Sequence, residues 1–323
     1  MIERNDGMII RKRTKPLILR KYEILRTRLK RNFLRIQQID RAYGKYMKGY
    51  MGEVKVDYYL QFLEQITTIL QDVCLKLDGK SVQLDNIIIS QHAIYIVEVK
   101  NYSGTIIFDT TLNQFIRDDG KKETGFSHPI TQVELQQHKL QNWLHHNGFT
   151  NIPIYYFVAI SEPSTIIKVI GDTEPIAKVV AHGERIPHII LDIEKKLENT
   201  NKIIHQKIGH TILKKCIDFD RDIMKEHEIK REDLVNGVKC TNCDMLGMQR
   251  TPRNWVCPKC EHKDRHAHHL AIKEYLLLYQ WITNQACKNF LQVNSRHMVN
   301  KALKNINLTY EPANKRWVKN KQK

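Results

Sequence analysis

The chain has 323 residues, of which 41% are hydrophobic. This length is enough for two or three domains with at least one sizeable core, and the apolar fraction excludes wholesale disorder. No stretch approaches the roughly 18 consecutive apolar residues of a membrane span, and the Arg- and Lys-rich start lacks the apolar core of a signal peptide. We therefore expect a soluble, cytoplasmic protein without membrane association, whose seven cysteines are metal ligands or buried thiols rather than disulfides.

The positive charge of the chain lies at its two ends. The net charge is +17, and residues 1–50 carry 15 basic and 4 acidic groups, while residues 263–323 carry 12 basic and 3 acidic groups. Basic surfaces attract polyanions by counterion release, so a nucleic acid is the expected partner, with DNA favoured over RNA. The charge alone leaves open a solvated helix face or a tail that touches an anionic membrane.

The residue pattern in the first half of the chain predicts two helices, a meander of strands, a helix and a further strand. Apolar residues three or four apart predict a basic amphipathic helix over 17–43 and a second helix over 50–70, with Gly44 and Gly49 between them. A period of two then predicts strands over 73–77, 82–89, 93–100 and 105–108, followed by a helix over 131–146 and a strand over 154–160. This order predicts an α/β (α+β) fold, with helices packed on a mixed sheet.

The pattern is weaker beyond residue 161. It predicts a strand over 178–180, helices over 185–197 and 203–217, and a domain boundary within the charged segment 218–236. Near the carboxy terminus it predicts helices over 271–281, 284–290 and 295–305, and then a wing-like segment over 308–318.

Charged residues inside the predicted strands point to a catalytic site. Glu98 and Lys100 alternate in one strand and so share a face, and Asp85 lies in the preceding strand. Apolar residues surround Glu98 and Asp85, where an unpaired charge is costly. Two carboxylates beside a lysine suit Mg²⁺- or Mn²⁺-assisted phosphodiester hydrolysis, in which the acids hold the metal and the lysine orients the nucleophile or stabilises the transition state. A satisfied Glu98–Lys100 pair at a sheet edge is the structural alternative.

Several segments together resemble the nuclease-related (NERD) domain, which is similar to the PD-(D/E)xK restriction-endonuclease-like superfamily. They are Gly49–Glu53, Asp57–Leu60, Asp85, Glu98–Asn101 and His128–Gln132. The resemblance implies a restriction-endonuclease-like mixed sheet flanked by helices. It also implies the site residues: Glu53, Asp85 and Glu98 as the acidic metal ligands, Lys100 as the catalytic lysine, and Gln132 as the polar residue of the following helix. Asp57, one helical turn after Glu53, is interpreted as its solvated neighbour.

Four cysteines form the sharpest motif in the chain. Cys240-x2-Cys243 and Cys257-x2-Cys260 are separated by thirteen residues. Each turn presents two thiolates to one tetrahedral ion, and the segment between them is long enough for a hairpin, so the spacing predicts a structural zinc ribbon that binds Zn²⁺.

The basic carboxy-terminal segment has the layout of a helix-turn-helix. A second helix over 295–305 would enter the major groove, with four polar residues facing the nucleic acid: Arg296, Asn300, Lys301 and Lys304. An ordinary helical hairpin with a solvated basic face is the alternative. The chain also resembles NERD proteins of the Bacillus type, which carry a cysteine ribbon and a helical tail.

These observations predict five parts of the chain. They are an amphipathic helix at 1–48, the nuclease-like domain at 49–165, a helical extension and linker at 166–236, the zinc ribbon at 237–264 and the basic helix-turn-helix-like unit at 265–323. The expected function is a metal-dependent nuclease that hydrolyses DNA. The alternative is a non-catalytic nucleic-acid-binding or regulatory protein that uses the nuclease fold as a scaffold.

Overall fold

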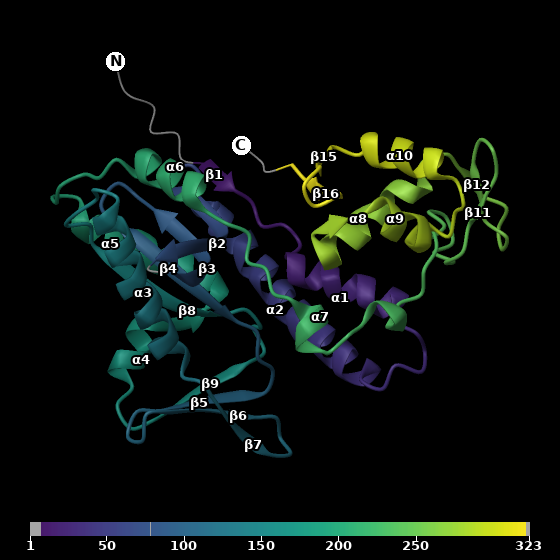
Figure 1. Ribbon diagram of the computed structural model, residues 1–323. Coiled ribbons are helices and arrows are strands. Elements are labelled where there is room, and N and C mark those ends of the chain that lie inside the picture. Colours follow the sequence, from purple (N-terminus) through teal and green to yellow (C-terminus); the bar gives the residue numbers. More distant parts are fainter. Residues whose placement is uncertain (1–7, 78, 321–323) are drawn as a thin grey trace. The chain divides into compact units, whose positions relative to one another are not determined.

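The computed structural model describes residues 8–77 and 79–320, which divide into two compact units (Figure 1). The first unit contains the described residues up to 16 together with 45–219, and the second contains 17–44 together with the described residues from 220 onward. The outermost ends of the predicted first and last parts, 1–7 and 321–323, lie outside the described residues. The finer division into five parts stays a prediction.

A six-stranded mixed sheet forms the centre of the first unit. Its strands are β1 (Met8–Arg11), β2 (Thr68–Leu77), β3 (Lys80–Ile89), β4 (Ile94–Lys100), β8 (Ile154–Ile160) and β10 (Val180–His182). They lie in the order β1-β2-β3-β4-β8-β10. β2, β3 and β4 form an antiparallel meander, as the alternation predicts, whereas β1, β8 and β10 run parallel to their neighbours.

Helices cover both faces of this sheet. One apolar cluster joins the sheet to α2 (Ile36–Leu60) and α5 (Ile186–Leu197), and another joins it to α3 (Pro129–His146), α4 (Glu174–Val179) and α6 (His205–Lys215). Tyr95 and Val97 of β4 belong to the first cluster, while Ile94 and Ile96 belong to the second. Because alternate residues share a face, Glu98 is directed to the α3 side.

A second, four-stranded sheet also belongs to the first unit. Its strands, in the order β7-β6-β5-β9, are β7 (Glu123–Phe126), β6 (Gln114–Asp118), β5 (Thr105–Asp109) and β9 (Ile166–Ile170). The strand predicted over 105–108 is therefore present, but it pairs in this sheet rather than in the meander. Two 3-10 turns, Gln61–Leu63 and Gly183–Arg185, complete the unit.

The amino-terminal helices differ from the sequence prediction. The chain breaks between α1 (Leu17–Arg28) and α2, and α2 continues through Gly44 and Gly49. A Cβ atom at either glycine would meet nothing within 4 Å, so close packing does not require glycine at these positions. The only cost of each glycine is its low helix propensity, which the surrounding helix tolerates. Gly52 is different, because a Cβ there would lie 2.6 Å from the Asn101 side chain. Glycine at this position lets α2 approach the end of β4 closely.

The second unit combines helices with two small sheets. Besides α1, its helices are α7 (Ile223–Glu226), the 3-10 turn Arg231–Asp233, α8 (Ala267–Tyr279), α9 (Asn284–Leu291) and α10 (Arg296–Lys304). One sheet consists of β11 (Gln249–Arg250), β12 (Trp255–Val256) and β13 (Lys263–Asp264), and the other of β14 (Trp281–Ile282), β16 (Arg316–Lys319) and β15 (Leu308–Glu311). The predicted helix, turn and helix with a wing-like hairpin are thus present.

One continuous core holds the cysteine-containing segment and the carboxy-terminal helices together. Cys240, Trp255 and Cys257 belong to the same buried cluster as Tyr275 and Phe290. A buried ion pair adds to this core, because the Arg28 side chain of α1 lies 2.6 Å from Glu274 of α8 and donates to the Gly237 carbonyl. Among the described residues, no helix has the length and apolar character of a membrane span.

Candidate functional site

The core of the candidate site lies between the end of β4 and the first turns of α3. Lys100 Nζ donates to Glu98 Oε1 at 2.6 Å and to Gln132 Oε1 at 2.8 Å. Gln132 Nε2 donates to Glu98 Oε1 at 2.6 Å, and Gln136 Nε2 donates to Glu98 Oε2 at 2.8 Å. The structure therefore joins three residues that the sequence singled out, and both oxygens of the buried Glu98 are held by donors.

Gln136 is a site residue that the sequence reasoning missed. It follows Gln132 by four residues and so shares its helix face, which is the signal that would have identified it. Its Nε2 also donates to the Gln83 carbonyl at 3.0 Å, whereas its buried Oε1 has no partner. Gln136 thus fixes Glu98 from the side opposite to Lys100 and leaves one acceptor unsatisfied inside the site.

The charge state of Lys100 follows from its surroundings. Burial disfavours the ammonium form and is the largest single cause, but the charge and hydrogen bond of Glu98 and the charge of Asp85 together raise the pKa of Lys100 above its ordinary value. Lys100 is consequently protonated at neutral pH. It suits electrostatic stabilisation of a phosphate better than proton abstraction.

Asp85 lies beside Glu98 at an irregularity of the sheet. The pairing of β2 with β3 skips Asp85 and the facing Asp72, whose φ is 52°, and such an irregularity re-aims the side chains around it. Asp85 Oδ2 accepts a hydrogen bond from the Val99 amide at 2.8 Å. Burial, followed by the negative charges of Glu98 and Glu53, raises the pKa of Asp85 well above its usual range. The three predicted acids are therefore close enough to repel one another.

An arginine that the sequence reasoning did not identify holds Glu53. Arg13 Nη1 donates to Glu53 Oε2 at 2.6 Å, Nε donates to Asp57 Oδ2 at 2.7 Å, and Nη2 donates to the backbone carbonyl of Asp85 at 2.7 Å. The interpretation of Asp57 as solvated is wrong, because Asp57 is buried against this guanidinium. Nothing in the basic run around residue 13 distinguishes Arg13 from its neighbours, so no local signal could have found it.

The donor set fits a hard divalent cation in chemistry but is not closed around one. Carboxylate oxygens are the ligands that Mg²⁺ and Mn²⁺ take, and the mutual repulsion of Glu53, Asp85 and Glu98 is what such a cation would relieve. Across residues 8–77 and 79–320, no three acidic side chains have ligand atoms within 4.8 Å of one another. One oxygen of Glu53 is bonded to Arg13 instead.

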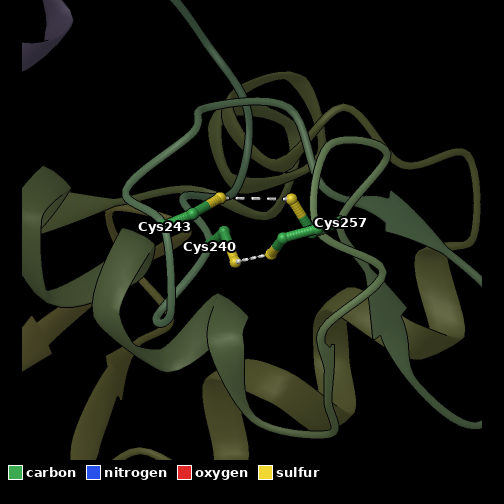
Figure 2. Close-up of side chains that lie close together, drawn as sticks. Cys240, Cys243 and Cys257 are labelled. Carbon is green, nitrogen blue, oxygen red and sulfur yellow. Dashed lines mark hydrogen bonds between the residues drawn. The ribbon is translucent and has the colours of Figure 1, made fainter.

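The four cysteines converge as their spacing predicts. The sulfurs of Cys240, Cys243, Cys257 and Cys260, here called the four-cysteine cluster, all lie within 4.8 Å of one another. The Cys240–Cys260 and Cys243–Cys257 sulfurs are 3.7 and 3.6 Å apart, and Figure 2 shows the labelled side chains turned toward a common centre. A tetrahedral ion with metal–sulfur bonds of about 2.3 Å requires sulfurs about 3.8 Å apart, so the cluster is compatible with a zinc ribbon.

The two Cys-x2-Cys turns of this cluster have the same backbone geometry. Asp244 N donates to Cys240 O at 3.1 Å, and Glu261 N donates to Cys257 O at 2.9 Å. Asp244 and Glu261 both have a left-handed φ, of 58° and 55°. Hydrogen bonds from the His262 amide and the Asn242 side chain lower the pKa of Cys260 to about 6. The turns thus present their thiols as matched pairs, and Cys260 favours the thiolate form.

The predicted nucleic-acid residues of α10 fall into two kinds. Arg296, Lys301 and Lys304 are exposed, and none forms an ion pair within the described part of the chain. Asn300 instead accepts a hydrogen bond from Asn284 of α9 and therefore contributes to packing between the two helices. All four stay predicted contacts to a nucleic acid, with the three basic residues exposed for contact with a phosphate backbone.

Comparison with known proteins finds a family similar to part of the first unit. The family model of the nuclease-related domain, NERD, matches residues 48–161. An uncharacterized protein of Bacillus anthracis is 27% identical over 190 residues, which cover 56% of this chain and 82% of that protein. The crystal structure of protein VC1899 from Vibrio cholerae is 12% identical, with a TM-score of 0.25, and the match covers 58% of this chain and 43% of that chain. Residues 48–161, which contain Glu53, Asp85, Glu98, Lys100 and Gln132, are thus similar to the nuclease-related domain.

Proposed function

We propose that this protein is a metal-dependent nuclease that hydrolyses phosphodiester bonds of DNA. The observation that carries the proposal is the network at the end of β4, in which Lys100, Gln132 and Gln136 fix both oxygens of Glu98 beside Asp85. A purely structural ion pair would not need a second buried acid with a raised pKa next to it. Perturbed acids grouped with a lysine are typical of catalytic sites.

The residues of this site would have different roles in hydrolysis. Asp85, Glu98 and Glu53 would hold Mg²⁺ or Mn²⁺, which when bound supplies Lewis-acid charge stabilisation and a water of lowered pKa. The protonated Lys100 would offset the negative charge that develops on the phosphate. Gln132 and Gln136 would keep the Glu98 carboxylate oriented, since each donates to a different oxygen of it.

The four-cysteine cluster has a structural role in this proposal. Its thiols are part of the core of the second unit, and four sulfur ligands complete the tetrahedral shell of a zinc ion and leave no position for substrate. The basic carboxy-terminal helices would bind the nucleic acid. A cytoplasmic location stays a prediction from the sequence.

Cleavage assays with the purified full chain test the proposal. Supercoiled, linear, branched and single-stranded DNA would each be incubated with Mg²⁺, Mn²⁺ or EDTA. We expect divalent-dependent cleavage that Glu98→Gln and Lys100→Ala abolish, while DNA binding in EDTA is unchanged. Glu174→Gln, which removes an exposed carboxylate of α4, is the matched control and should cleave like the wild type. Cleavage that survives both site variants would refute the assignment, and binding without cleavage under every ion would favour the non-catalytic alternative.

A further inference from the structure

A polar cavity in the second unit lies outside the candidate active site. Its volume is about 630 Å³, and its walls come from the β11–β12 hairpin, from the segment that leads into α8 and from α10. The hairpin contributes Arg250 and Arg253, the start of α8 is preceded by Arg265, and α10 contributes Lys301. The cavity therefore exists only because the cysteine-containing segment and the carboxy-terminal helices pack as one core.

The lining of this cavity is cationic, with the Asp264 carboxylate acting on His268 and His269 from outside the lining. No carboxylate is among the lining residues. Arg253, Arg265 and Lys301 form no ion pair within the range of residues that the structure covers. His266, His268 and His269 also line it; His266 is the N-cap residue of α8 and the other two lie in its first turn, where the helix dipole adds partial positive charge.

Positive charges in the lining also act on its histidines. Burial, together with the charges of the neighbouring His269 and Arg250, lowers the pKa of His268 to about 4. The Nε2 atom of His269 is buried and has no hydrogen-bond partner. The cavity is thus lined by three arginines and by a histidine with an unpartnered ring nitrogen, a polar lining that suits an anion.

We propose that this cavity binds a phosphate group of a nucleic-acid strand. Arginine forks match phosphate oxygens in geometry, and a lysine opposite them adds a point charge. The lining includes no Phe, Tyr or Trp, and guanidinium groups supply most of its charge, so the proposed ligand is the backbone rather than a nucleobase. This inference rests on the proposed function in one respect only, namely that nucleic acid is the partner.

The position of Lys301 connects the cavity to a longer basic surface. Lys301 lies on α10 with Arg296 and Lys304, both of which are exposed and free of ion pairs within the described chain. A strand whose phosphate enters the cavity would therefore find further cations along the same helix. A small phosphate ligand would gain nothing from them, and this difference favours the strand as the occupant.

The test measures binding rather than cleavage. Fluorescence anisotropy with labelled duplex and single-stranded DNA, in EDTA and over a range of salt concentrations, would compare the wild type with Arg265→Glu and Lys301→Glu. Both side chains are exposed, so the variants should fold, which circular dichroism and zinc content would verify. We expect weaker binding, and for each lost phosphate contact a salt slope smaller by about 1. Lys301→Arg should retain wild-type affinity.

A matched control and a competing ligand make the test decisive. Lys225→Glu changes the net charge equally on α7, outside the cavity, and should bind like the wild type. The proposal would be overturned if Arg265→Glu and Lys301→Glu bound DNA with the same affinity as Lys225→Glu. Calorimetric titration with inorganic phosphate supplies the other arm, since tight phosphate binding with unchanged DNA affinity would assign the cavity to a small anion instead. Because cleavage is not measured, an inactive nuclease site would leave this result unaffected.

Discussion

Removal of the Arg13 guanidinium should destabilise the first unit strongly when no divalent cation is present. The Arg13 side chain is 3% exposed and bridges Glu53, which is 21% exposed, and Asp57, which is 10% exposed. Arg13→Met keeps the apolar stem but leaves two largely buried carboxylates without a counter-charge near Asp85. Loss of one partner from a buried ion pair costs about 3–5 kcal/mol, and we expect about 3 kcal/mol because Glu53 is partly solvated.

Thermal unfolding monitored by circular dichroism measures this effect. For a unit of this size, about 3 kcal/mol corresponds to a fall in Tm of about 6–12 °C. Mg²⁺ should restore a large part of the loss, because a divalent cation can supply the charge that Arg13 no longer provides. The additional substitution Asp57→Asn should also restore part of it, because one unpaired carboxylate is then neutral.

A matched variant separates this effect from a general loss of charge. Arg26→Met removes an arginine whose partner, Asp40, is 53% exposed, and should cost less than about 1 kcal/mol because solvent screens the pair. A loss for Arg13→Met as small as that of Arg26→Met would refute the reasoning. An Arg13→Met deficit that Mg²⁺ leaves unchanged would show that the acids around Arg13 do not hold a cation.

The buried acids, the glycines of α2 and the four-cysteine cluster give four more predictions. The pKa values of Asp85 and Glu53 are raised in the folded protein, so the folded state binds protons more tightly than the unfolded state. The resulting contribution to the free energy of unfolding is present at low pH and is lost as pH rises through the raised pKa values. Urea midpoints measured without divalent ions would reveal this loss. Asp85→Asn removes a buried charge and should raise stability at neutral pH by about 1–2 kcal/mol while abolishing cleavage, and a destabilised variant would contradict this. Gly52→Ala would place a Cβ 2.6 Å from Asn101 and should cost about 1–3 kcal/mol, whereas Gly49→Ala meets nothing and should stabilise α2 by about 0.5–1 kcal/mol, as paired melts would show. Extraction of metal from the four-cysteine cluster should unfold the second unit, with one zinc released per chain by atomic absorption.

The sequence was informative wherever a site is built from neighbours on one element. Glu98 and Lys100 alternate in a strand, so their common face followed from the period of two, and the two Cys-x2-Cys turns followed from the reach of a tight turn. The match of residues 48–161 to the nuclease-related domain and the convergence of the four cysteines confirm these readings at the level of domain and cluster. The roles of the individual acids stay predictions.

The sequence was less informative about helix boundaries. Gly44 and Gly49 suggested an interruption, but the helix runs through them and breaks instead before Ile36. Tertiary packing overrides the modest cost of a helical glycine, so glycine is a weak indicator of a boundary when the flanking residues pack well.

By itself the sequence determined which side chains could bind a metal or a nucleic acid: paired acids with a lysine, four thiols at ligand spacing, and basic ends on a middle of small net charge. Only the tertiary structure decided which of them meet across long separations. Arg13 reaches Glu53 from forty residues away, and Lys301 shares a cavity with Arg250 and Arg265 through the packing of one core. The physical reason is that periodicity and spacing act within a single element, whereas these contacts depend on how whole elements bury their apolar faces, a property that no local pattern encodes.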